Sequence, residues 1–344
     1  MPIEPWSEIV GQERAVRLLR RALGRGQPHH AYLLAGPPGV GKELLARLFA
    51  QAANCEVEDV SARPCGECPA CKGIARGSYP DVQWVMPLAE LIARGKVSRA
   101  DFEGAASREI RVDEVRELSR RLSFAPVRGR RKIAILTPAD ALNERAQNTL
   151  LKTLEEPPPS TSFVLVTAQP DQLLATVRSR CARVQLMPLS DELIAARLVQ
   201  AGVAAGEARE RAHRAGGSLG RALGMSGDEL SRAREMLSGV EAALADSDER
   251  AALDLSEALG ERDAAAQTAQ VVLQATRDEL VALARAKEPP PVALPPTVLL
   301  AQHALCTEVI AALEQNGNPR LQLERLLLGL RNLRSGQRKE AAGG

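Results

Sequence analysis

The chain has 344 residues, which is enough for two or three domains. Hydrophobic residues make up 45% and aromatic residues only 2%, so Leu, Ala and Val must build most of the buried cores, and the composition favours helix. The formal net charge of +2 excludes a uniformly basic nucleic-acid-binding chain, so any contact with nucleic acid requires a local patch.

The N-terminal stretch MPIEPWSEIVGQ has no basic run leading into an apolar run, and no segment offers ~18 uncharged apolar residues. We therefore expect no secretory signal, no membrane span and a cytoplasmic location. In a reducing compartment, clustered cysteines bind metal more often than they form disulfides.

Strand-like and helix-like segments alternate up to about residue 187. Short apolar runs predict buried strands, and apolar residues on one face predict helices. The predicted strands are 30–35, 132–137 and 162–167, with a strand-like stretch at 183–186; the predicted helices are 42–53, 112–122, 143–156 and a short one at 173–179. This alternation favours a parallel sheet covered on both faces.

The stretch GPPGVGKE, beginning at Gly36, has the G-x-x-x-x-G-K spacing of a phosphate-binding loop. Gly36, Gly39 and Gly41 let the backbone turn its N–H groups towards phosphate, and Lys42 can reach a β- or γ-phosphate. The alternative is a chance Gly/Pro turn. A working loop continues with Ser or Thr, whose hydroxyl binds Mg²⁺, whereas Glu43 adds negative charge beside the phosphates.

The second support for Mg²⁺ should be an acidic residue at the end of the strand 132–137, but the chain has Thr137 and Pro138 there. Asp140 is expected to lie out of register, in the following turn. Two parts of the metal machinery therefore look absent. We predict a site without Mg²⁺-dependent ATP hydrolysis that still permits weak ATP or ADP binding.

Four cysteines within 55–71 have the spacing of a zinc site. Cys65, Cys68 and Cys71 are separated by two-residue gaps, and Cys55 lies nine intervening residues upstream. A module this small buries little surface, so a structural zinc ion would supply its folding energy. The alternatives are disulfides or free thiols in a core.

Three further features have simpler interpretations. Cys181 and Cys306 are isolated and are expected to be small buried apolar residues. The basic run RGRRK at 128–132 is either a solvated turn or a contact to DNA phosphate, and we favour the turn. The segment 88–107 does not fit the alternation and is expected to be an inserted surface loop.

Beyond about Pro188 the strand signal ends and helix formers dominate. A stiff Pro-rich connector spans 288–296, and Asn318 can cap a helix that has Pro319 at its first position. We expect a P-loop domain at 1–187 with a metal module at 55–71, a small helical domain at 188–226, a helical bundle at 227–336 and a disordered tail at 337–344.

The chain resembles the clamp-loader subunits of bacterial DNA polymerase III, within the AAA+ group. The resemblance is carried by IVGQE (9–13), the phosphate loop, the four-cysteine module with GSYPD after it, NTLLKTLEEPP (148–158), SRC (179–181) and NPRLQLERLLL. It implies an AAA+ P-loop parallel sheet with an inserted zinc module, followed by a helical lid and an α-helical collar.

Within that family, motor subunits hydrolyse ATP, and one subunit of the same build has a decayed site. Three departures place this sequence with the latter: Glu43, the pair Thr137-Pro138, and Gly220, which stands where the motors carry a nucleotide-sensing Arg. Arg221 lies one position later. We therefore expect no ATPase activity from the chain's own site.

The resemblance also gives Arg180 of SRC a function. From the residue pattern alone, Arg180 is an ordinary surface or salt-bridge arginine. The resemblance implies that it acts in trans as an arginine finger in a neighbouring motor's ATP site. Thr167 matches the first sensor position. The implied partners are motor subunits, the delta subunit, the sliding clamp and primed-template DNA, in a hetero-oligomer.

Two other functions remain open. An active ATPase motor would use Glu43 as an unusual Mg²⁺ ligand and would need Asp140 to swing in. A zinc-dependent scaffold unrelated to replication would leave LLKTLEEPP and SRC unexplained.

Overall fold

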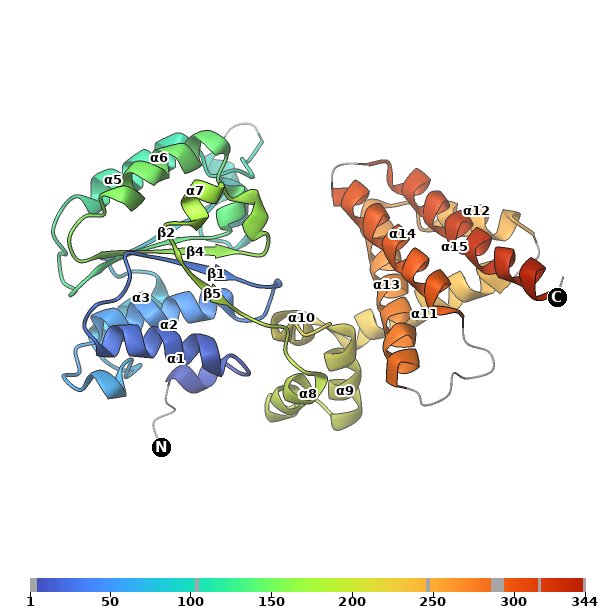
Figure 1. Ribbon diagram of the computed structural model, residues 1–344, viewed down its shortest axis with the longest axis horizontal. Coiled ribbons are helices and arrows are strands. Elements are labelled where there is room, and N and C mark those ends of the chain that lie inside the picture. Colours follow the sequence, from blue (N-terminus) through green and yellow to red (C-terminus); the bar gives the residue numbers. More distant parts are fainter. Residues whose placement is uncertain (1–4, 103–104, 246–247, 286–293, 315–316, 343–344) are drawn as a thin grey trace. The chain divides into compact units, whose positions relative to one another are not determined.

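The computed structural model describes residues 5–102, 105–245, 248–285, 294–314 and 317–342. The chain forms two compact units that divide between Leu223 and Gly224. The first unit holds the sheet, the helices that cover it and a group of three small helices that follows it, and the second contains helices but no strand among its described residues (Figure 1).

The first unit is built on a parallel sheet of five strands in the order β2-β3-β4-β1-β5. The strands are β1 (Ala31–Ala35), β2 (Val82–Val85), β3 (Lys132–Leu136), β4 (Thr161–Thr167) and β5 (Ala182–Gln185). Ala35 pairs with Thr167 on one side and with Gln185 on the other, so three strands end together beside the phosphate loop.

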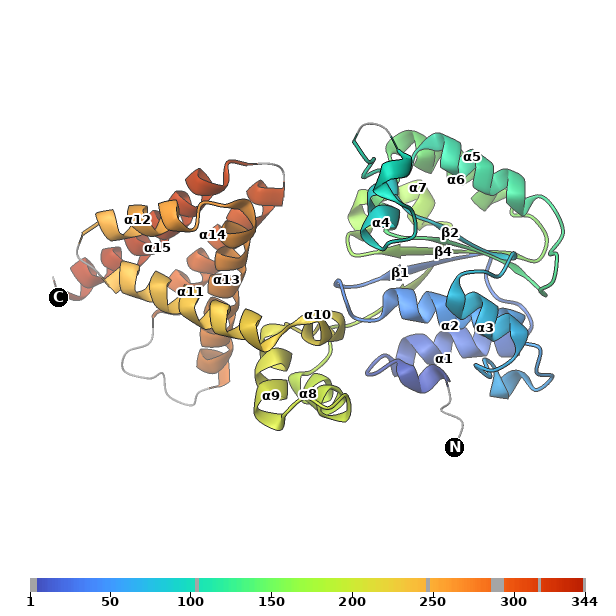
Figure 2. The ribbon, with the colours of Figure 1, turned by 180° about the vertical axis from the view of Figure 1, so that it is seen from behind.

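Helices cover both faces of this sheet, as the alternation predicts (Figures 1 and 2). One layer contains α1 (Glu13–Gly24), α2 (Lys42–Asn54) and α3 (Pro69–Arg76); the other contains α5 (Val112–Leu122), α6 (Glu144–Glu155) and α7 (Ala175–Arg178). Successive side chains of a strand point to opposite faces. Tyr32 and Leu34 accordingly enter one core, while Leu33 enters the other.

The predicted strands and helices of the first unit are confirmed to within two residues. Strand β2 is absent from the prediction because VQWV is short and three of its four residues are only partly buried. The segment 88–107 is not entirely loop, since it contains α4 (Leu88–Ala93) and a 3-10 turn (Arg99–Asp101).

The basic run at 128–132 is a turn tied to the protein interior, as the sequence favours. Asp81 is buried, and its carboxylate accepts hydrogen bonds from the backbone N–H groups of Val127, Arg128 and Gly129 at 2.7, 2.8 and 2.6 Å. The buried Asn54 side chain accepts two more, from the N–H groups of residues 130 and 131. Asp81 belongs to the GSYPD segment, which therefore has a structural function here.

Three helices follow β5: α8 (Asp191–Gln200), α9 (Ala205–Arg214) and α10 (Leu219–Gly224). They enclose a small core of their own, which includes Ile194, Leu198 and Ala212. This helical group matches the segment expected after residue 188, but the boundaries at 188 and 227 stay predictions.

The second unit is a helical bundle around a Leu- and Val-rich core. Its helices are α11 (Gly227–Ala245), α12 (Arg250–Ala258), α13 (Arg262–Arg285), α14 (Pro296–Glu314) and α15 (Pro319–Ala342). The Asn318 side chain caps α15 by accepting from the N–H of Leu321 at 3.2 Å. Most of the predicted Pro-rich connector lies outside the described residues.

Helix α15 continues to Ala342, into the stretch 337–344 where a disordered tail is predicted. Its last residues include Arg, Lys, Glu and Ala, which are strong helix formers, so nothing in this composition stops the helix early.

Among the described residues, one segment is long and apolar enough to cross a membrane: Pro296–Leu313 of α14, with a mean hydropathy of 1.4. Leu299, Cys306 and Val309 of this helix are fully buried in the bundle. A third of the segment is buried in this way, so burial explains only part of its apolar character.

The Asp81 contacts predict a large loss of stability on substitution. We expect Asp81→Ala to lower the free energy of unfolding of the first unit by about 3 kcal/mol, because three backbone N–H groups lose their shared buried acceptor. Urea unfolding followed by tryptophan fluorescence measures this, since both tryptophans, Trp6 and Trp84, lie in that unit. Asp113→Ala is the control, because the Asp113 side chain is 92% exposed. Equal stability of the two variants would contradict the assignment.

Candidate functional site

The phosphate loop joins β1 to α2, in the strand–loop–helix context that its mechanism requires. Gly39 and Gly41 adopt positive φ values of 72° and 97°, which favour glycine. The Lys42 ammonium group is buried and donates to the carbonyl oxygens of Gly36 and Pro37, both at 2.6 Å. The four predicted loop residues therefore lie together, with the lysine bonded to the loop itself.

Glu43 is held by two partners from distant parts of the chain. Its carboxylate receives two hydrogen bonds from the Arg94 guanidinium, at 2.7 and 2.8 Å, and one from the Thr137 hydroxyl at 2.7 Å. Burial alone would raise the pKa of Glu43, but the bonds from Arg94 and Thr137 outweigh burial and lower the pKa. Glu43 is thus a stabilised carboxylate anion with a fixed orientation.

Arg94 follows α4, in the segment that the sequence leaves unassigned. It also donates to Glu90 of the same segment at 2.7 Å. The sequence gives no local signal for this contact, because Arg94 and Glu43 are 51 positions apart. The segment 88–107 therefore contributes a residue to the loop's surroundings.

Asp140 lies in the turn that follows β3, as the sequence indicates. It occupies a short 3-10 turn (Ala139–Ala141), and its carboxylate accepts a hydrogen bond from the hydroxyl of Thr167, the predicted sensor position. Burial lowers the pKa of Lys42, and the charges of Asp140 and Glu43 oppose that shift. As expected, Asp140 lies in the turn after β3 and not on the strand itself, and this turn brings its carboxylate to Thr167 at the end of β4.

Gly220 makes a close backbone contact with the phosphate loop. Its N–H donates to the carbonyl oxygen of Gly39 at 2.9 Å, and a Cβ atom at Gly220 would lie 3.2 Å from the Gly39 Cα. A Cβ atom at Gly39 would in turn overlap the Ser218 hydroxyl. Gly220, at the predicted sensing position, therefore packs against the loop at a place that leaves little room for a side chain.

Arg180 lies at the surface, on the turn after α7, with 34% of its side chain exposed. Its guanidinium donates to the Glu155 carboxylate at 2.5 Å and to the Thr176 carbonyl at 2.9 Å. Glu155 is the last residue of α6 and belongs to the LLKTLEEPP segment. Two segments that carry the family resemblance are thus joined by one ion pair, and Arg180 is partly available to a neighbour.

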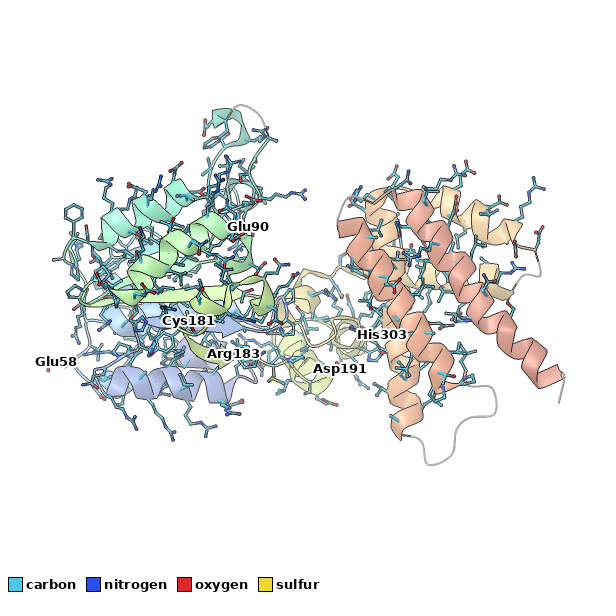
Figure 3. All side chains as sticks on the ribbon, turned by 45° about the horizontal axis from the view of Figure 1, so that its top comes forward. Glu58, Glu90, Cys181, Arg183, Asp191 and His303 are labelled. Atoms are coloured by element: carbon cyan, nitrogen blue, oxygen red, sulfur yellow. The ribbon has the colours of Figure 1, made fainter. Side chains whose placement is uncertain are left out.

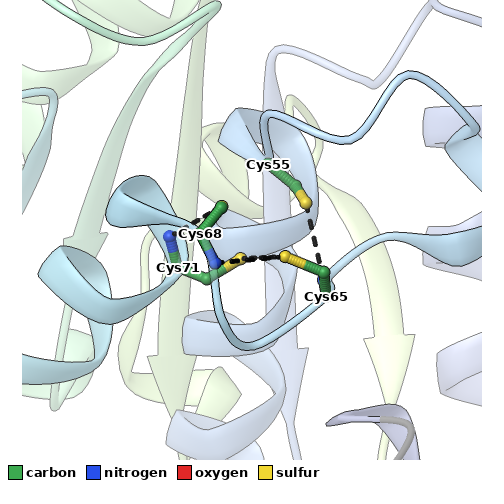
Figure 4. A group of neighbouring side chains, drawn as sticks. All are labelled: Cys55, Cys65, Cys68 and Cys71. Carbon is green, nitrogen blue, oxygen red and sulfur yellow. Dashed lines mark hydrogen bonds between the residues drawn. The ribbon is translucent and has the colours of Figure 1, made fainter. Parts of the chain in front are cut away.

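The four cysteines of the predicted metal module converge on one point (Figure 4). The sulfur atoms of Cys55, Cys65, Cys68 and Cys71 all lie within 4.8 Å of one another, and those of Cys65 and Cys71 are 4.0 Å apart. A tetrahedral site with Zn–S bonds of ~2.3 Å places its sulfurs roughly 3.8 Å apart, so this group fits zinc. No disulfide joins any cysteine of the chain.

The electrostatics of the module also suit a metal ion. Backbone N–H groups of Cys65, Cys68 and Cys71 point to sulfur atoms at 3.4, 3.3 and 3.4 Å and stabilise thiolate charge. Burial opposes ionisation of Cys65, but the N–H groups of Cys68 and Glu67 outweigh it and lower its pKa to about 7. Burial raises the pKa of Cys55, so a metal ion must displace its proton.

Of the other two cysteines, Cys306 is a buried core residue, as predicted, whereas Cys181 is only partly buried. Cys181 packs beside the second core of the sheet unit (Figure 3), and Cys306 is fully buried in the helical bundle. Burial raises the pKa of each thiol to about 12, so neither is a reactive thiolate.

Comparison with known proteins identifies relatives of the first unit. The family model described as DNA polymerase III, delta subunit, matches residues 11–190, slightly more than half of the chain. DNA polymerase III subunit tau/gamma of Haemophilus influenzae is 37% identical over 193 residues, which are 56% of this chain and 25% of that protein. DNA polymerase III subunit delta' of Pseudomonas aeruginosa is 37% identical over 187 residues, 54% of this chain and 49% of that protein.

The chain thus spans from a quarter to about half of the length of these curated relatives. Among solved structures, a DNA polymerase III gamma subunit-related protein of Thermotoga maritima is 16% identical, with a TM-score of 0.45. That alignment covers 92% of this chain and 99% of the other.

The sulfur geometry predicts that the purified chain holds about one zinc ion. We expect Cys65→Ser to lose most of this zinc on dialysis against a chelator, because one of four thiolate ligands is gone. Elemental analysis by mass spectrometry measures the content. Cys181→Ala is the matched control, since it removes a thiol outside the cluster. Absence of zinc from the wild-type chain, or equal zinc in both variants, would refute the site.

Proposed function

Because the chain belongs to the DNA polymerase III delta-subunit family, we propose that it is a clamp-loader subunit of the delta-prime type. In this proposal it acts in the cytoplasm as one member of a hetero-oligomer with ATPase motor subunits and a delta subunit. The complex loads the sliding clamp onto primed-template DNA. The chain hydrolyses no ATP in its own site and contributes an arginine to a neighbouring site.

The contact between Glu43 and Thr137 carries the proposal that the chain's own site is inactive. In P-loop NTPases, a Ser or Thr at the first of these positions and an acidic residue on the neighbouring strand together support Mg²⁺. Here the residues at the two positions, Thr137 and Glu43, share a hydrogen bond of 2.7 Å, and Glu43 also forms an ion pair with Arg94. An entering Mg²⁺ ion would compete with a guanidinium for this carboxylate.

The state of Lys42 supports the same proposal. Its ammonium group must leave two carbonyl oxygens of the loop before it can contact a β- or γ-phosphate. Those bonds offset part of the energy that phosphate binding would provide. Weak binding of ATP or ADP without Mg²⁺-dependent hydrolysis is therefore the behaviour that we propose.

Arg180 is the group that we propose to act in trans. An arginine finger stabilises the charge that develops on the transferring phosphoryl group. Arg180 is anchored by Glu155 at a partly exposed edge of the sheet unit, so its guanidinium is oriented before any neighbour arrives. This orientation lowers the entropy that is lost when the arginine enters the neighbouring site.

A second candidate, an active ATPase motor, is favoured by one observation. The Asp140 carboxylate lies close enough to Lys42 to influence its pKa and is bonded to Thr167 at the sensor position. A motor would have to release Glu43 from Arg94 and recruit Asp140 to the metal. We prefer the proposal of an inactive site, because an active motor would require both of these rearrangements.

ATPase assays of the isolated chain separate the two candidates. We expect phosphate release by the wild-type chain with ATP, Mg²⁺ and primed DNA to equal that of the Lys42→Ala variant. The reason is that Glu43 and Thr137, at the positions that would support Mg²⁺, are bonded to each other and Glu43 to Arg94. Mg²⁺-dependent turnover that disappears in Lys42→Ala would identify a motor instead. The zinc content of both preparations confirms that the folded module is intact.

A reconstituted complex tests the function of Arg180. We expect Arg180→Ala to slow the adjacent ATP site by about 10³-fold or more, so the complex loses that site's share of DNA-stimulated hydrolysis. Arg178→Ala is the matched control, because Arg178 lies in α7 and pairs with Asp171. Size-exclusion chromatography verifies assembly. Equal hydrolysis by both variant complexes and the wild type would remove Arg180 from the mechanism.

A further inference from the structure

Helix α1 and its C-cap carry a row of four arginines: Arg14, Arg17, Arg21 and Arg25. All four are exposed. At ~100° per residue, the first, third and fourth lie within about 40° of one another around the helix, and Arg17 lies about 60° from Arg14. The row is about 16 Å long at ~1.5 Å per residue. Long side chains project from α1 away from the sheet (Figure 3).

None of these four arginines has a carboxylate partner among the described residues, in contrast to some other arginines of the same unit. Arg47 pairs with Glu8, and Arg178 pairs with Asp171. No such ion pair joins any of the four α1 arginines within the described part of the chain. Their charges therefore remain available to a ligand.

Two open grooves run along the flanks of this row, with volumes of about 780 and 550 Å³. Arg17 and Arg21 line both grooves, so they form the ridge between them. Arg14 and Arg25 line the second groove, while Arg20 and Arg63 add charge to the first. Glu13 is the one acidic residue among the described lining residues of either groove.

We propose that this arginine row binds the phosphodiester backbone of nucleic acid. A nucleic-acid strand presents a regular line of phosphates, and the guanidinium fork matches phosphate geometry with two hydrogen bonds. Because the whole chain carries a net charge of only +2, the attraction is local to α1.

The arginine row contacts the phosphate backbone, and among the described aromatic rings that line the grooves only His29 is exposed. Trp6 and Tyr32 line the grooves but are 6% and 1% exposed, so neither offers a ring for base stacking. Phosphate contacts carry no sequence information. The row lies outside the phosphate loop and does not depend on the proposed inactivity of that loop.

Fluorescence anisotropy of the full chain with a labelled single strand and with a duplex of the same length tests the proposal. The test variant has Arg14, Arg17, Arg21 and Arg25 all changed to Gln. The control variant carries the same change at four exposed arginines that form no such row, at positions 197, 209, 232 and 250. Both variants have the same formal net charge, +2 − 4 = −2.

We expect the test variant to bind at least ~10-fold more weakly at low salt than the control. Its plot of log K against log salt should be flatter by roughly 2.8 for the single strand or 3.6 for the duplex, for four lost phosphate contacts. The larger of the two wild-type affinities shows which form of nucleic acid the row accepts. Thermal unfolding and zinc content establish that both variants are folded.

Two results would overturn the proposal. Equal weakening in both variants would show an effect of net charge alone, and equal binding by the test variant and the wild type would show that the row is not used. A polyglutamate peptide of matched charge is the competitor. If the wild type binds this peptide through the row but binds neither nucleic acid, the ligand is an acidic protein segment and the assignment is wrong.

Discussion

The hydrogen bond between Glu43 and Thr137 sets the character of the phosphate loop. It joins the start of α2 to the end of β3. Arg94, from a third segment, donates two further hydrogen bonds to the Glu43 carboxylate. A carboxylate with a paired guanidinium and a hydroxyl donor has its hydrogen bonds satisfied without a metal ion. Glu43, the unusual residue of the loop, is thus stabilised by partners from distant parts of the chain. Its bonds to Arg94 and Thr137 are of the kind that a structural residue makes.

Contacts between residues far apart in the sequence also fix the irregular segments of the first unit. Asp81 and Asn54 accept backbone N–H groups from one turn, so a loop rich in arginine is fixed by buried acceptors. The four-cysteine module is too small for a core of its own and gathers its sulfurs around one point. Arg180 is anchored by Glu155 in a comparable way. Each of these contacts fixes backbone that has no regular secondary structure.

Features that depend on neighbouring residues in the sequence could be predicted, whereas contacts between residues far apart in the sequence could not. Strands such as β1 are continuous apolar runs, and the cysteines lie within 17 positions, so local patterns identify both. Strand β2 escapes because Gln83 and Trp84 are only partly buried, which leaves no apolar run. Arg94 escapes for another reason: its partner depends on how an unassigned segment folds against α2, and no spacing in the sequence encodes that contact.

Gly36 and Gly39 of the loop have a packing explanation that does not require nucleotide. A Cβ atom at Gly36 would come within 2.5 Å of the Leu186 carbonyl, and Gly39 is covered by Ser218 and Gly220. The loop is therefore a joint at which β1, the segment after β5 and the start of α10 meet at backbone distance. Lys42 bonds to two carbonyls of that joint, so internal contacts involve Gly36, Gly39 and Lys42 of the motif. Gly41 is different: no atom lies within 4 Å of a Cβ placed there, and only its positive φ of 97° favours glycine. A phosphate-loop motif alone is thus weak evidence for catalysis, and the residues that would hold the metal decide the question.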